Sequence, residues 1–335
     1  MRQCQACHPL ELHYQIRFSG KENLHYFPQV VAYLDKNNLL VRYKKDIIVV
    51  KESGVAGLYD FFADHMDINQ LSFRVDHREW RPIHELPVLI ESQWIDEVIA
   101  KQSVTCHIQP IVDSEEQIFA YEMLSRLTGE SGQFISPAEA FAAAKSRNRT
   151  YALDRICRLA AVRQAARIKE KVFINFIPTS IYSPEHCLQS TVHLANLLGI
   201  EPSQFVFEVV ETEEVEDMDH LRKVLTYYKE KGFHYALDDV GAGFSTVEVL
   251  EELAPHYMKL DMKYVQGISI DPLKQQAADA MLQAALRTGA VPLAEGVEEQ
   301  EDFNWLKNIG YELFQGYLFG KPAPVPQAEE MVFPN

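Results

Sequence analysis

Residues 235–243 read YALDDVGAG, a short apolar run followed by two adjacent carboxylates, Asp238 and Asp239, and a glycine-rich turn. The run has the length of a buried strand, so the two acids stand where that strand ends. Two like charges about 4 Å apart repel each other by roughly 4 kcal/mol at an effective dielectric near 20. The sequence therefore predicts a charge conflict at this strand end, which another part of the protein has to resolve.

The same pattern continues on both sides of this stretch. From about residue 104 onward, short β-rich runs alternate with longer helical patterns, which is typical of a parallel α/β fold. Eight runs predict strands: TCHIQPIV (105–112), IFAYEML (118–124), KVFINF (171–176), QFVFEVV (204–210), HYALDD (234–239), YMKLD (257–261), AVPLAEGV (290–297) and ELFQG (312–316). Eight strands with helices between them suit a TIM-like (β/α)8 barrel, which typically needs about 250 residues.

The first two predicted strands are joined only by DSEEQ (113–117). This connection is too short for a helical crossover, so the two strands are expected to pair antiparallel. Two of the helices carry clear end signals. SPAEAFAAAKSRN begins with Ser136 before a proline, and DPLKQQAADAMLQAALRTG runs from Asp271 to Gly289. The predicted fold is α/β, a modified (β/α)8 barrel with an antiparallel first strand.

The first 90 residues predict a separate small α/β module. Its expected strands are ELHYQIRF (11–18), NLLVRYKKDIIVV (38–50) and NQLSFRV (69–75), and its expected helices are FPQVVAYLDKN (27–37) and GVAGLYDFFADHM (54–66). The predicted organisation is thus a module over 1–90, a linker helix over 91–103 and the barrel over 104–330. A sensory or dimerisation role is expected for the module, and a purely structural appendage is the alternative.

Composition sets the class of protein. The chain has 335 residues, 47% of them hydrophobic and 24% charged, as in an ordinary globular protein. The formal net charge of -16 argues against general binding of nucleic-acid polymers, which requires a basic face. No apolar run is long enough for membrane insertion, and the polar start MRQCQACHPLE is unlike a signal peptide, so a cytoplasmic location is expected.

The five cysteines do not suggest a disulfide framework. Cys106, Cys157 and Cys187 stand in apolar stretches and are expected in the core. Cys4 and Cys7 form a CxxC motif beside His8, which resembles half of a zinc site. No second CxxC follows, so a structural metal and a simple thiol pair both stay open for this motif.

The strand ends of the predicted barrel carry polar residues in unbroken succession. In a (β/α)8 barrel the C-terminal ends of all strands meet at one mouth. The residues there are Glu122, Asn175, Glu208 with Glu211 shortly after it, Asp238 with Asp239, Lys259 with Asp261, Glu295 and Gln315. Each alone has a plain explanation, such as a helix cap or a solvated face. Their succession on seven strand ends favours a functional site.

The chemistry of these residues indicates divalent cations. Several carboxylates in one pocket raise one another's pKa unless cations offset them. The donors are oxygens, with no His or Cys at these strand ends, so a hard ion such as Mg²⁺ or Mn²⁺ is expected. Adjacent aspartates suit two ions, and two ions about 4 Å apart promote displacement at phosphorus. A Schiff-base enzyme built on Lys259 is the alternative that the residues leave open.

Seven stretches carry a resemblance to a known family: YEMLSR (121–126), FINF (173–176), FVFEVVE (205–211), LDDVGAGFS (237–245), MKLD (258–261), AEGVE (294–298) and QGYLFGKP (315–322). Over about residues 104–325 the chain resembles the EAL-domain cyclic-di-GMP phosphodiesterases. The resemblance implies hydrolysis of cyclic di-GMP to linear pGpG with two Mg²⁺ or Mn²⁺ ions. It also implies a homodimer.

The resemblance further implies a role for each matching residue. One ion would be bound by Glu122, Asn175, Glu208 and Asp238, and the other by Asp238, Asp239 and Glu295. Lys259 would contact the attacking water, and Glu211 would stabilise the loop after the paired aspartates. Substrate contacts are implied for Gln109 at guanine, Arg126 at phosphate, and Leu124, Gln315 and Pro322 around the nucleotide.

Five positions depart from the family pattern. Met123 replaces the usual Ala, and Val210 replaces the usual Thr. In the loop after the paired aspartates, Val240, Ala242 and Phe244 replace the usual Phe, Thr and Tyr. These changes remove no expected metal ligand, but they alter the loop that links dimer contacts to the metals in the family. The alternative implied is a catalytically weak receptor that binds cyclic di-GMP and signals through the N-terminal module.

Overall fold

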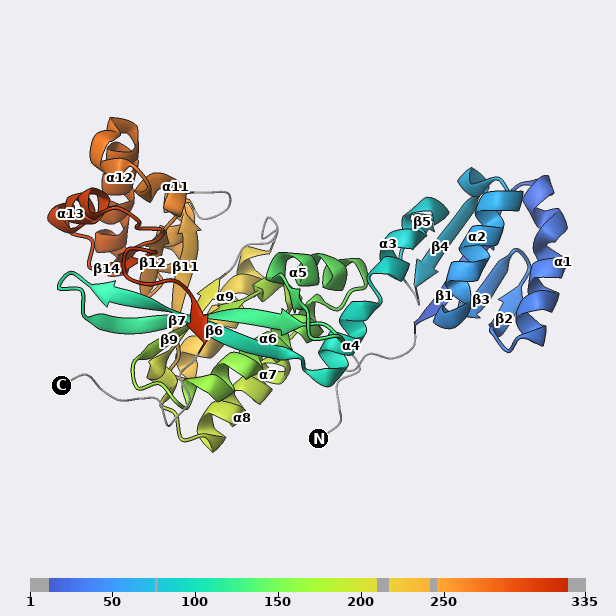
Figure 1. The fold of residues 1–335 in the computed structure, drawn as a ribbon, viewed down its shortest axis with the longest axis horizontal. Helices are drawn as coiled ribbons and strands as arrows, with labels where there is room; N and C mark the ends of the chain where they lie inside the picture. Colours follow the sequence, from blue (N-terminus) through green and yellow to red (C-terminus); the bar gives the residue numbers. More distant parts are fainter. Residues whose placement is uncertain (1–11, 76–77, 210–216, 242–245, 325–335) are drawn as a thin grey trace. The chain divides into compact units, whose positions relative to one another are not determined.

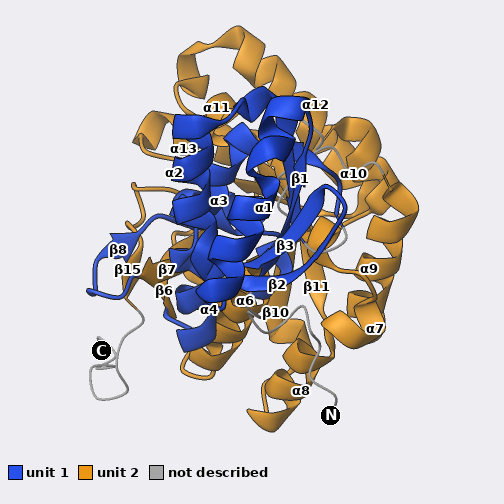
Figure 2. Cartoon of the chain, turned by 90° about the vertical axis from the view of Figure 1, so that its right-hand side faces the viewer, with its two compact units in different colours: residues 1–103, 129–152 blue, residues 104–128, 153–335 orange. Residues whose placement is uncertain are grey.

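The computed structural model describes residues 12–75, 78–209, 217–241 and 246–324. The chain divides into two compact units, shown in Figure 2. Unit 1 comprises residues 1–103 and 129–152, and unit 2 comprises residues 104–128 and 153–335. Residues 129–152 therefore group with the N-terminal part of the chain, although the sequence places them between two strands of the barrel.

Unit 1 contains a sheet of five strands in the order β2-β3-β1-β4-β5 (Figure 1). Its core is aromatic and aliphatic, and Tyr14, Phe18, Phe62 and Phe73 are each at most 1% exposed. The elements up to residue 103 are β1 (His13–Phe18), α1 (Lys21–Lys36), β2 (Leu40–Lys44), β3 (Ile47–Lys51), η2 (Glu52–Gly54), α2 (Val55–His65), η3 (Ile68–Gln70), β4 (Leu71–Val75), β5 (Arg81–Pro82), η4 (Ile83–Glu85), α3 (Leu86–Glu91) and α4 (Trp94–Lys101).

The stretch NLLVRYKKDIIVV forms two strands rather than one. Strands β2 and β3 pair antiparallel across a tight turn, in which Lys44 opposes Ile47. Lys45 adopts a left-handed backbone with φ of 54° to make the turn. Only Lys45 and Asp46 interrupt the β-forming residues, and the turn contains no Gly, Asn or Pro, so the sequence pattern did not separate the two strands.

Unit 2 is a barrel. Within the described residues eight strands close it, and β6 pairs with both β7 and β14. The strands are β6 (Val104–Asp113), β7 (Ile118–Thr128), β9 (Lys171–Phe176), β10 (Phe205–Val209), β11 (His234–Val240), β12 (Tyr257–Leu260), β13 (Val291–Ala294) and β14 (Leu313–Gln315). Strand β6 is antiparallel to both neighbours, whereas β7 and β9 through β14 run parallel. The predicted (β/α)8 barrel with an antiparallel first strand is confirmed.

The helices with predicted ends form as expected. Ser136 caps α5 by accepting a hydrogen bond from the N–H of Glu139, and Asp271 caps α12 in the same way. The remaining elements are β8 (Phe134–Ile135), α5 (Pro137–Ser146), α6 (Thr150–Ala165), η5 (Pro178–Ser180), α7 (Pro184–Cys187), α8 (Gln189–Leu197), η6 (Pro202–Gln204), α9 (Met218–Glu230), α10 (Val247–Leu253), α11 (Met262–Val265), η7 (Ile268–Ile270), α12 (Pro272–Thr288), α13 (Gln300–Ile309) and β15 (Ala323–Pro324).

The interior of the barrel holds one layer of packed side chains with a contribution from every strand. Its members are Ile111, Ala120, Phe173, Val206, Ala236, Tyr257, Leu293 and Leu313. Because side chains alternate between the two faces of a strand, residues two positions further along point the same way. This layer therefore fixes which residues line the barrel mouth.

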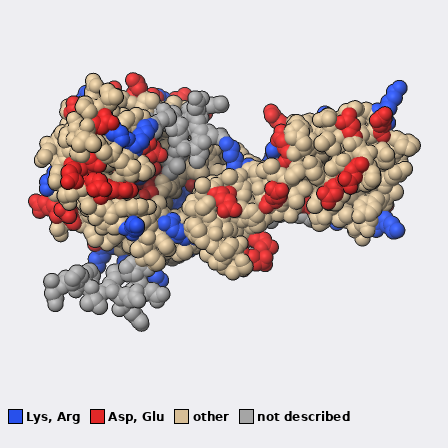
Figure 3. Space-filling view, turned by 45° about the horizontal axis from the view of Figure 1, so that its top comes forward, with Lys and Arg blue, Asp and Glu red and all other residues tan. Residues whose placement is uncertain are grey.

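Other sequence expectations are met in part. Cys106, Cys157 and Cys187 are free and buried, as predicted, whereas Cys4, Cys7 and His8 lie outside the described residues. Among the residues that the structure describes, no helix is both long enough and apolar enough to cross a bilayer. Figure 3 shows Asp and Glu side chains spread over the visible face of each unit, with Lys and Arg scattered among them rather than gathered in one basic patch.

Candidate active site

The polar residues of the barrel mouth all belong to one layer. Each follows a member of the apolar layer by two positions in the chain, and all lie on the strands except Glu295, which directly follows β13: Glu122, Asn175, Glu208, Asp238, Lys259, Glu295 and Gln315. On the antiparallel strand β6 the direction reverses, and Gln109 precedes Ile111 by two. The alternation of side chains thus points these eight residues toward the same end of the barrel.

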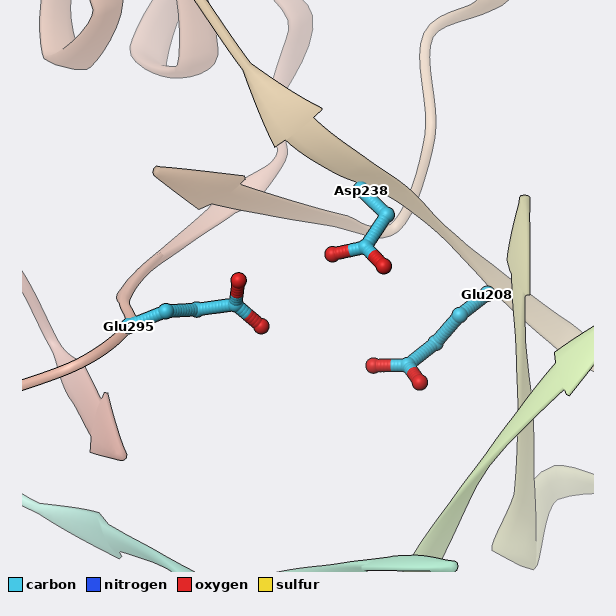
Figure 4. Close-up of side chains that lie close together, drawn as sticks. All are labelled: Glu208, Asp238 and Glu295. Atoms are coloured by element: carbon cyan, nitrogen blue, oxygen red, sulfur yellow. The ribbon is translucent and has the colours of Figure 1, made fainter. Parts of the chain in front are cut away.

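Three carboxylates from this layer meet at close range. Glu208, Asp238 and Glu295 each place an oxygen within 4.8 Å of the others. They come from β10, from β11 and from the residue that follows β13, and in Figure 4 they point toward one another. The sequence analysis predicted that these residues converge, and the geometry agrees.

Lys259 supplies the positive charge at the centre of this group. Its Nζ lies 2.5 Å from Glu208 Oε1 and 2.9 Å from Asp238 Oδ1, and it also pairs with Glu295. The side chain of Lys259 is 1% exposed and that of Glu208 is fully buried. Water therefore screens these charges little, and each pairing is strong.

The balance of charge shifts the pKa values of the group. Burial raises the pKa of Glu208 and of Glu295, and neighbouring carboxylates raise both further. Burial alone would lower the pKa of Lys259, but the surrounding carboxylates hold it well above its usual value. Lys259 is thus kept as an ammonium ion. A Schiff base requires a neutral amine, so the structure disfavours the alternative built on Lys259.

A chain of amides connects Glu122 to the rest of the layer. Asn175 Nδ2 donates to Glu122 Oε1 at 2.8 Å, and Gln315 Nε2 donates to Glu122 Oε2 at 2.6 Å. Gln315 also donates to Gln109 Oε1 at 3.2 Å, and Gln109 in turn donates to the Gly320 carbonyl. Together with Lys259 these bonds hold the pKa of Glu122 below its usual value, although burial opposes them. Glu122 is therefore held as an ionised carboxylate in a fixed orientation.

Asp239 differs from the other acids of the barrel mouth because its place in strand β11 does not match the alternation of side chains. It follows Ala236 by three residues, so a regular strand would turn its side chain away from the layer. The register between β11 and β12 is irregular from Leu237 to Val240, and Asp239 has a left-handed φ of 50°. Burial, and then the charges of Asp238 and Asp261, raise its pKa to about 6. The carboxylate of Asp239 is not part of the group formed by Glu208, Asp238 and Glu295.

Two contacts shape the loops of the mouth. Gly316 approaches the loop after β13 so closely that an added Cβ would lie 1.9 Å from the Val297 carbonyl oxygen, so only glycine fits. Val297 donates its N–H to the carbonyl of Gln315 at 3.0 Å. Tyr264 donates its hydroxyl to the Gly241 carbonyl at 2.7 Å and holds the turn after the paired aspartates. Nothing in the sequence singled out Tyr264.

Among the described residues, no hydrogen bond or ion pair joins the other predicted site residues to the carboxylate group. Arg126 donates to the carbonyls of Leu124 and Ser125, at 3.4 and 3.0 Å, and all three are partly exposed. Pro322 is also partly exposed. Glu211 lies outside the described residues, as does Val210. The structure thus brings together the ligands predicted at the strand ends, with Asp239 apart. Of the predicted substrate contacts, Gln109 and Gln315 belong to the same hydrogen-bonded group.

The donor set fits a divalent metal. All of its members offer oxygen: four carboxylates (Glu122, Glu208, Asp238, Glu295) and the amide of Asn175, which suits Mg²⁺ or Mn²⁺. Both carboxylate oxygens of Glu208 are buried without a hydrogen-bond donor, apart from the ion pair with Lys259. One ammonium cannot neutralise four carboxylates. A second source of positive charge at this point is therefore consistent with the residues present.

Comparison with known proteins identifies the family to which the barrel belongs. The model of the EAL domain family matches residues 92–322, which is well over half of the chain. The chain belongs to the EAL-domain family. A curated relative, the cyclic di-GMP phosphodiesterase PdeF of Escherichia coli, is 26% identical over 223 residues, covering 65% of this chain and 30% of the relative. The chain spans about a third of the length of the curated relatives it matches, at 32%, 32% and 30% of the first three.

Solved EAL structures extend the comparison. A standalone EAL protein from Vibrio cholerae, in a c-di-GMP-bound form, is 35% identical with a TM-score of 0.59, and the match covers 66% of this chain and 92% of that one. BlrP1 from Klebsiella pneumoniae, in a complex with calcium and cyclic di-GMP, is 22% identical with a TM-score of 0.60. That match covers 94% of this chain and 97% of the other, so the likeness in fold extends beyond the EAL domain.

The charge balance of this EAL domain generates a stability prediction. Lys259→Met removes the ammonium and leaves buried carboxylates uncompensated, which typically costs about 3–5 kcal/mol. We expect this loss in the free energy of unfolding at pH 8 in EDTA, and partial recovery with Mn²⁺, because the ion replaces the lost charge. Urea unfolding under both conditions measures it. Lys223→Met on the exposed face of α9 is the control. Equal stability of Lys259→Met and wild type in EDTA would contradict the charge balance described above.

Proposed function

We propose that the barrel is a metal-dependent phosphodiesterase that hydrolyses cyclic di-GMP to linear pGpG. The observation that carries this proposal is the single layer of four carboxylates, one Asn, one Lys and two Gln at the barrel mouth. The name of the relative PdeF and the ligand of the Vibrio cholerae structure support the choice of substrate. The family match supports a catalytic rather than a structural role for the layer.

The reaction adds one water across one phosphodiester bond. The water oxygen bonds to phosphorus, the bond from phosphorus to the 3′ oxygen breaks, and the departing oxygen takes up a proton. Divalent ions would lower the pKa of the water and stabilise the leaving oxygen. Lys259, which pairs with three carboxylates in this structure, would leave these pairs when the ions bind and would orient the water toward phosphorus through its N–H groups.

The proposed metal ligands are residues of the polar layer at the barrel mouth, together with Asp239. We propose that Glu122, Asn175, Glu208 and Asp238 bind one Mg²⁺ or Mn²⁺ ion, and that Asp238, Asp239 and Glu295 bind a second. The left-handed backbone at Asp239 supports this assignment, because it lets two adjacent residues depart from strict alternation. Glu295 would act in catalysis beside Lys259, with Glu211 stabilising the neighbouring loop.

The substrate would lie across the mouth. Arg126 suits a phosphate because its planar guanidinium can donate to two oxygens at once. Gln109, Leu124, Gln315 and Pro322 are the remaining proposed contacts. Gln109 and Gln315 hydrogen-bond each other, so the substrate would meet a preorganised amide pair.

Hydrolysis tests the proposal directly. Wild-type protein with Mg²⁺ or Mn²⁺ is expected to convert cyclic di-GMP to pGpG, followed by chromatography. Glu122→Gln keeps the shape of the side chain but removes its charge, and is expected to lower kcat at least about 100-fold. Glu115→Gln, on the exposed turn after β6, is the matched control and should retain wild-type turnover.

The same assay distinguishes a phosphodiesterase from a receptor that only binds cyclic di-GMP. Binding of cyclic di-GMP without any product over hours, with both metals and across pH, would contradict a phosphodiesterase and establish a receptor. Turnover that is equal in Glu122→Gln and wild type would contradict the assignment of the layer as the catalytic site.

We further propose that the N-terminal module regulates the barrel. The support comes from Arg147, whose buried side chain gathers contacts within unit 1. Its Nη2 lies 2.6 Å from Glu52 Oε1, its Nη1 donates to the Leu89 carbonyl at 2.9 Å, and its Nε donates to Asp96 Oδ2 at 3.0 Å. Arg147 follows α5, and the chain then enters α6, which continues into unit 2. A conformational change in the module that moves Arg147 would therefore also move the segment of chain between β7 and β9 of the barrel.

Glu52→Gln tests this regulation. The substitution weakens the charged contact to Arg147, and we expect a decrease in kcat of about threefold, since couplings of this kind are about 0.5–2 kcal/mol. Glu22→Gln, at an exposed position of α1, serves as control and should leave kcat unchanged. Wild-type kcat in Glu52→Gln, with the thermal midpoint lowered, would indicate that the contact is structural only.

A further inference from the structure

Helix α6 contains a buried ion pair that the layer of the barrel mouth does not include. Arg158 Nη1 lies 3.2 Å from Asp154 Oδ2, and the two side chains are 0% and 2% exposed. Burying such a pair gains little stability, because both charges lose their hydration. The pair is therefore weak evidence for added stability, and the other contacts of Asp154 indicate what it does.

Asp154 binds the backbone at the end of strand β9. Its Oδ1 accepts the N–H of Ile177 at 3.0 Å, in a buried environment. The pairing of β9 with β7 ends at Ile174, and the pairing with β10 ends at Phe176. Among the described residues no strand pairing extends to Ile177, and a buried N–H without a partner is costly. The carboxylate of Asp154 supplies that partner.

The bond to Ile177 fixes the part of β9 that enters the site. Ser180 donates its hydroxyl to the Ile177 carbonyl at 2.7 Å, so both polar groups of this residue are bound. Asn175 lies two positions before Ile177, and its amide donates to Glu122 at 2.8 Å. A shift of the strand end would move the Asn175 oxygen and the carboxylate of Glu122 together.

We propose that Asp154 is a positioning residue for the metal site: through the N–H of Ile177 it holds the strand end that presents Asn175 and, with it, Glu122. Arg158 keeps the carboxylate of Asp154 in place. The inference rests on the proposed metal-dependent function, and it adds a residue remote from the mouth to the groups on which metal affinity depends. Partners of this kind commonly change metal affinity or activity by about 10- to 100-fold.

Two substitutions at one position test it. Asp154→Ala removes the acceptor, and we expect a Mn²⁺ affinity and a kcat about tenfold lower, at the low end of the range for such partners, with KM for cyclic di-GMP within about twofold of wild type. Asp154→Asn retains an oxygen that can accept the Ile177 N–H and should restore most of both. Calorimetry gives the Mn²⁺ affinity, and the ¹H–¹⁵N resonance of Ile177 reports its hydrogen bond.

A matched control comes from a second buried aspartate. Asp302 on α13 is 2% exposed and accepts the N–H groups of Gly267 and Ser269 at 2.7 and 2.9 Å. Asp302→Ala should lower the thermal midpoint but leave Mn²⁺ affinity unchanged. Wild-type Mn²⁺ affinity and kcat in Asp154→Ala, or equal losses in Asp302→Ala, would overturn the proposal.

If Asp154→Ala does not fold, Asp154→Asn decides. The proposal is supported if the Mn²⁺ affinity and the Ile177 resonance both change. It is also supported if both keep their wild-type values, because the Asn oxygen then replaces the carboxylate as acceptor. A change in either one without the other contradicts it. Both measurements are made without substrate. A wild-type protein that binds Mn²⁺ but hydrolyses nothing would contradict the proposed hydrolysis, and the role of Asp154 in Mn²⁺ binding could still be tested.

Discussion

One buried ammonium surrounded by four carboxylates is the constraint on which the site depends. Lys259 is 1% exposed and contacts Glu208, Asp238 and Glu295, while Glu122 is held nearby by two amide donors. Charges this close and this dry cannot balance with a single cation. Burial and the neighbouring carboxylates raise the pKa of Glu208 and of Glu295 in the absence of further cations, and this crowding of acids suits the mouth to divalent ions.

Most of this arrangement was predictable from the sequence because strands alternate. The apolar residues Phe173, Val206 and Ala236 fill the barrel, and the polar residues two positions later must share their direction. Once the eight strands were recognised, the convergence of Glu122, Glu208, Asp238 and Glu295 followed without coordinates. The antiparallel first strand was predictable from a five-residue connection, DSEEQ, which no helix could span.

The rest required the structure, since it depends on irregular backbone or on partners far apart in the chain. The irregular register at Asp239 breaks the alternation and has no sequence signal of its own. Arg147 and Asp154 stand in helical stretches where charged residues usually face water. Their roles arise only when residues 129–152 pack with unit 1 and when β9 ends against α6. Such contacts are set by tertiary packing, which local patterns do not encode.

The central claim is that divalent ions join the carboxylates of the layer. Crystals grown with excess Mn²⁺ and measured at the manganese absorption edge test it most directly. The account predicts an anomalous peak bonded to oxygens of both Glu208 and Asp238, with the Lys259 ammonium displaced from the space between them. An accessible mouth that shows no such peak, with Lys259 still paired to all three carboxylates at saturating Mn²⁺, would contradict it.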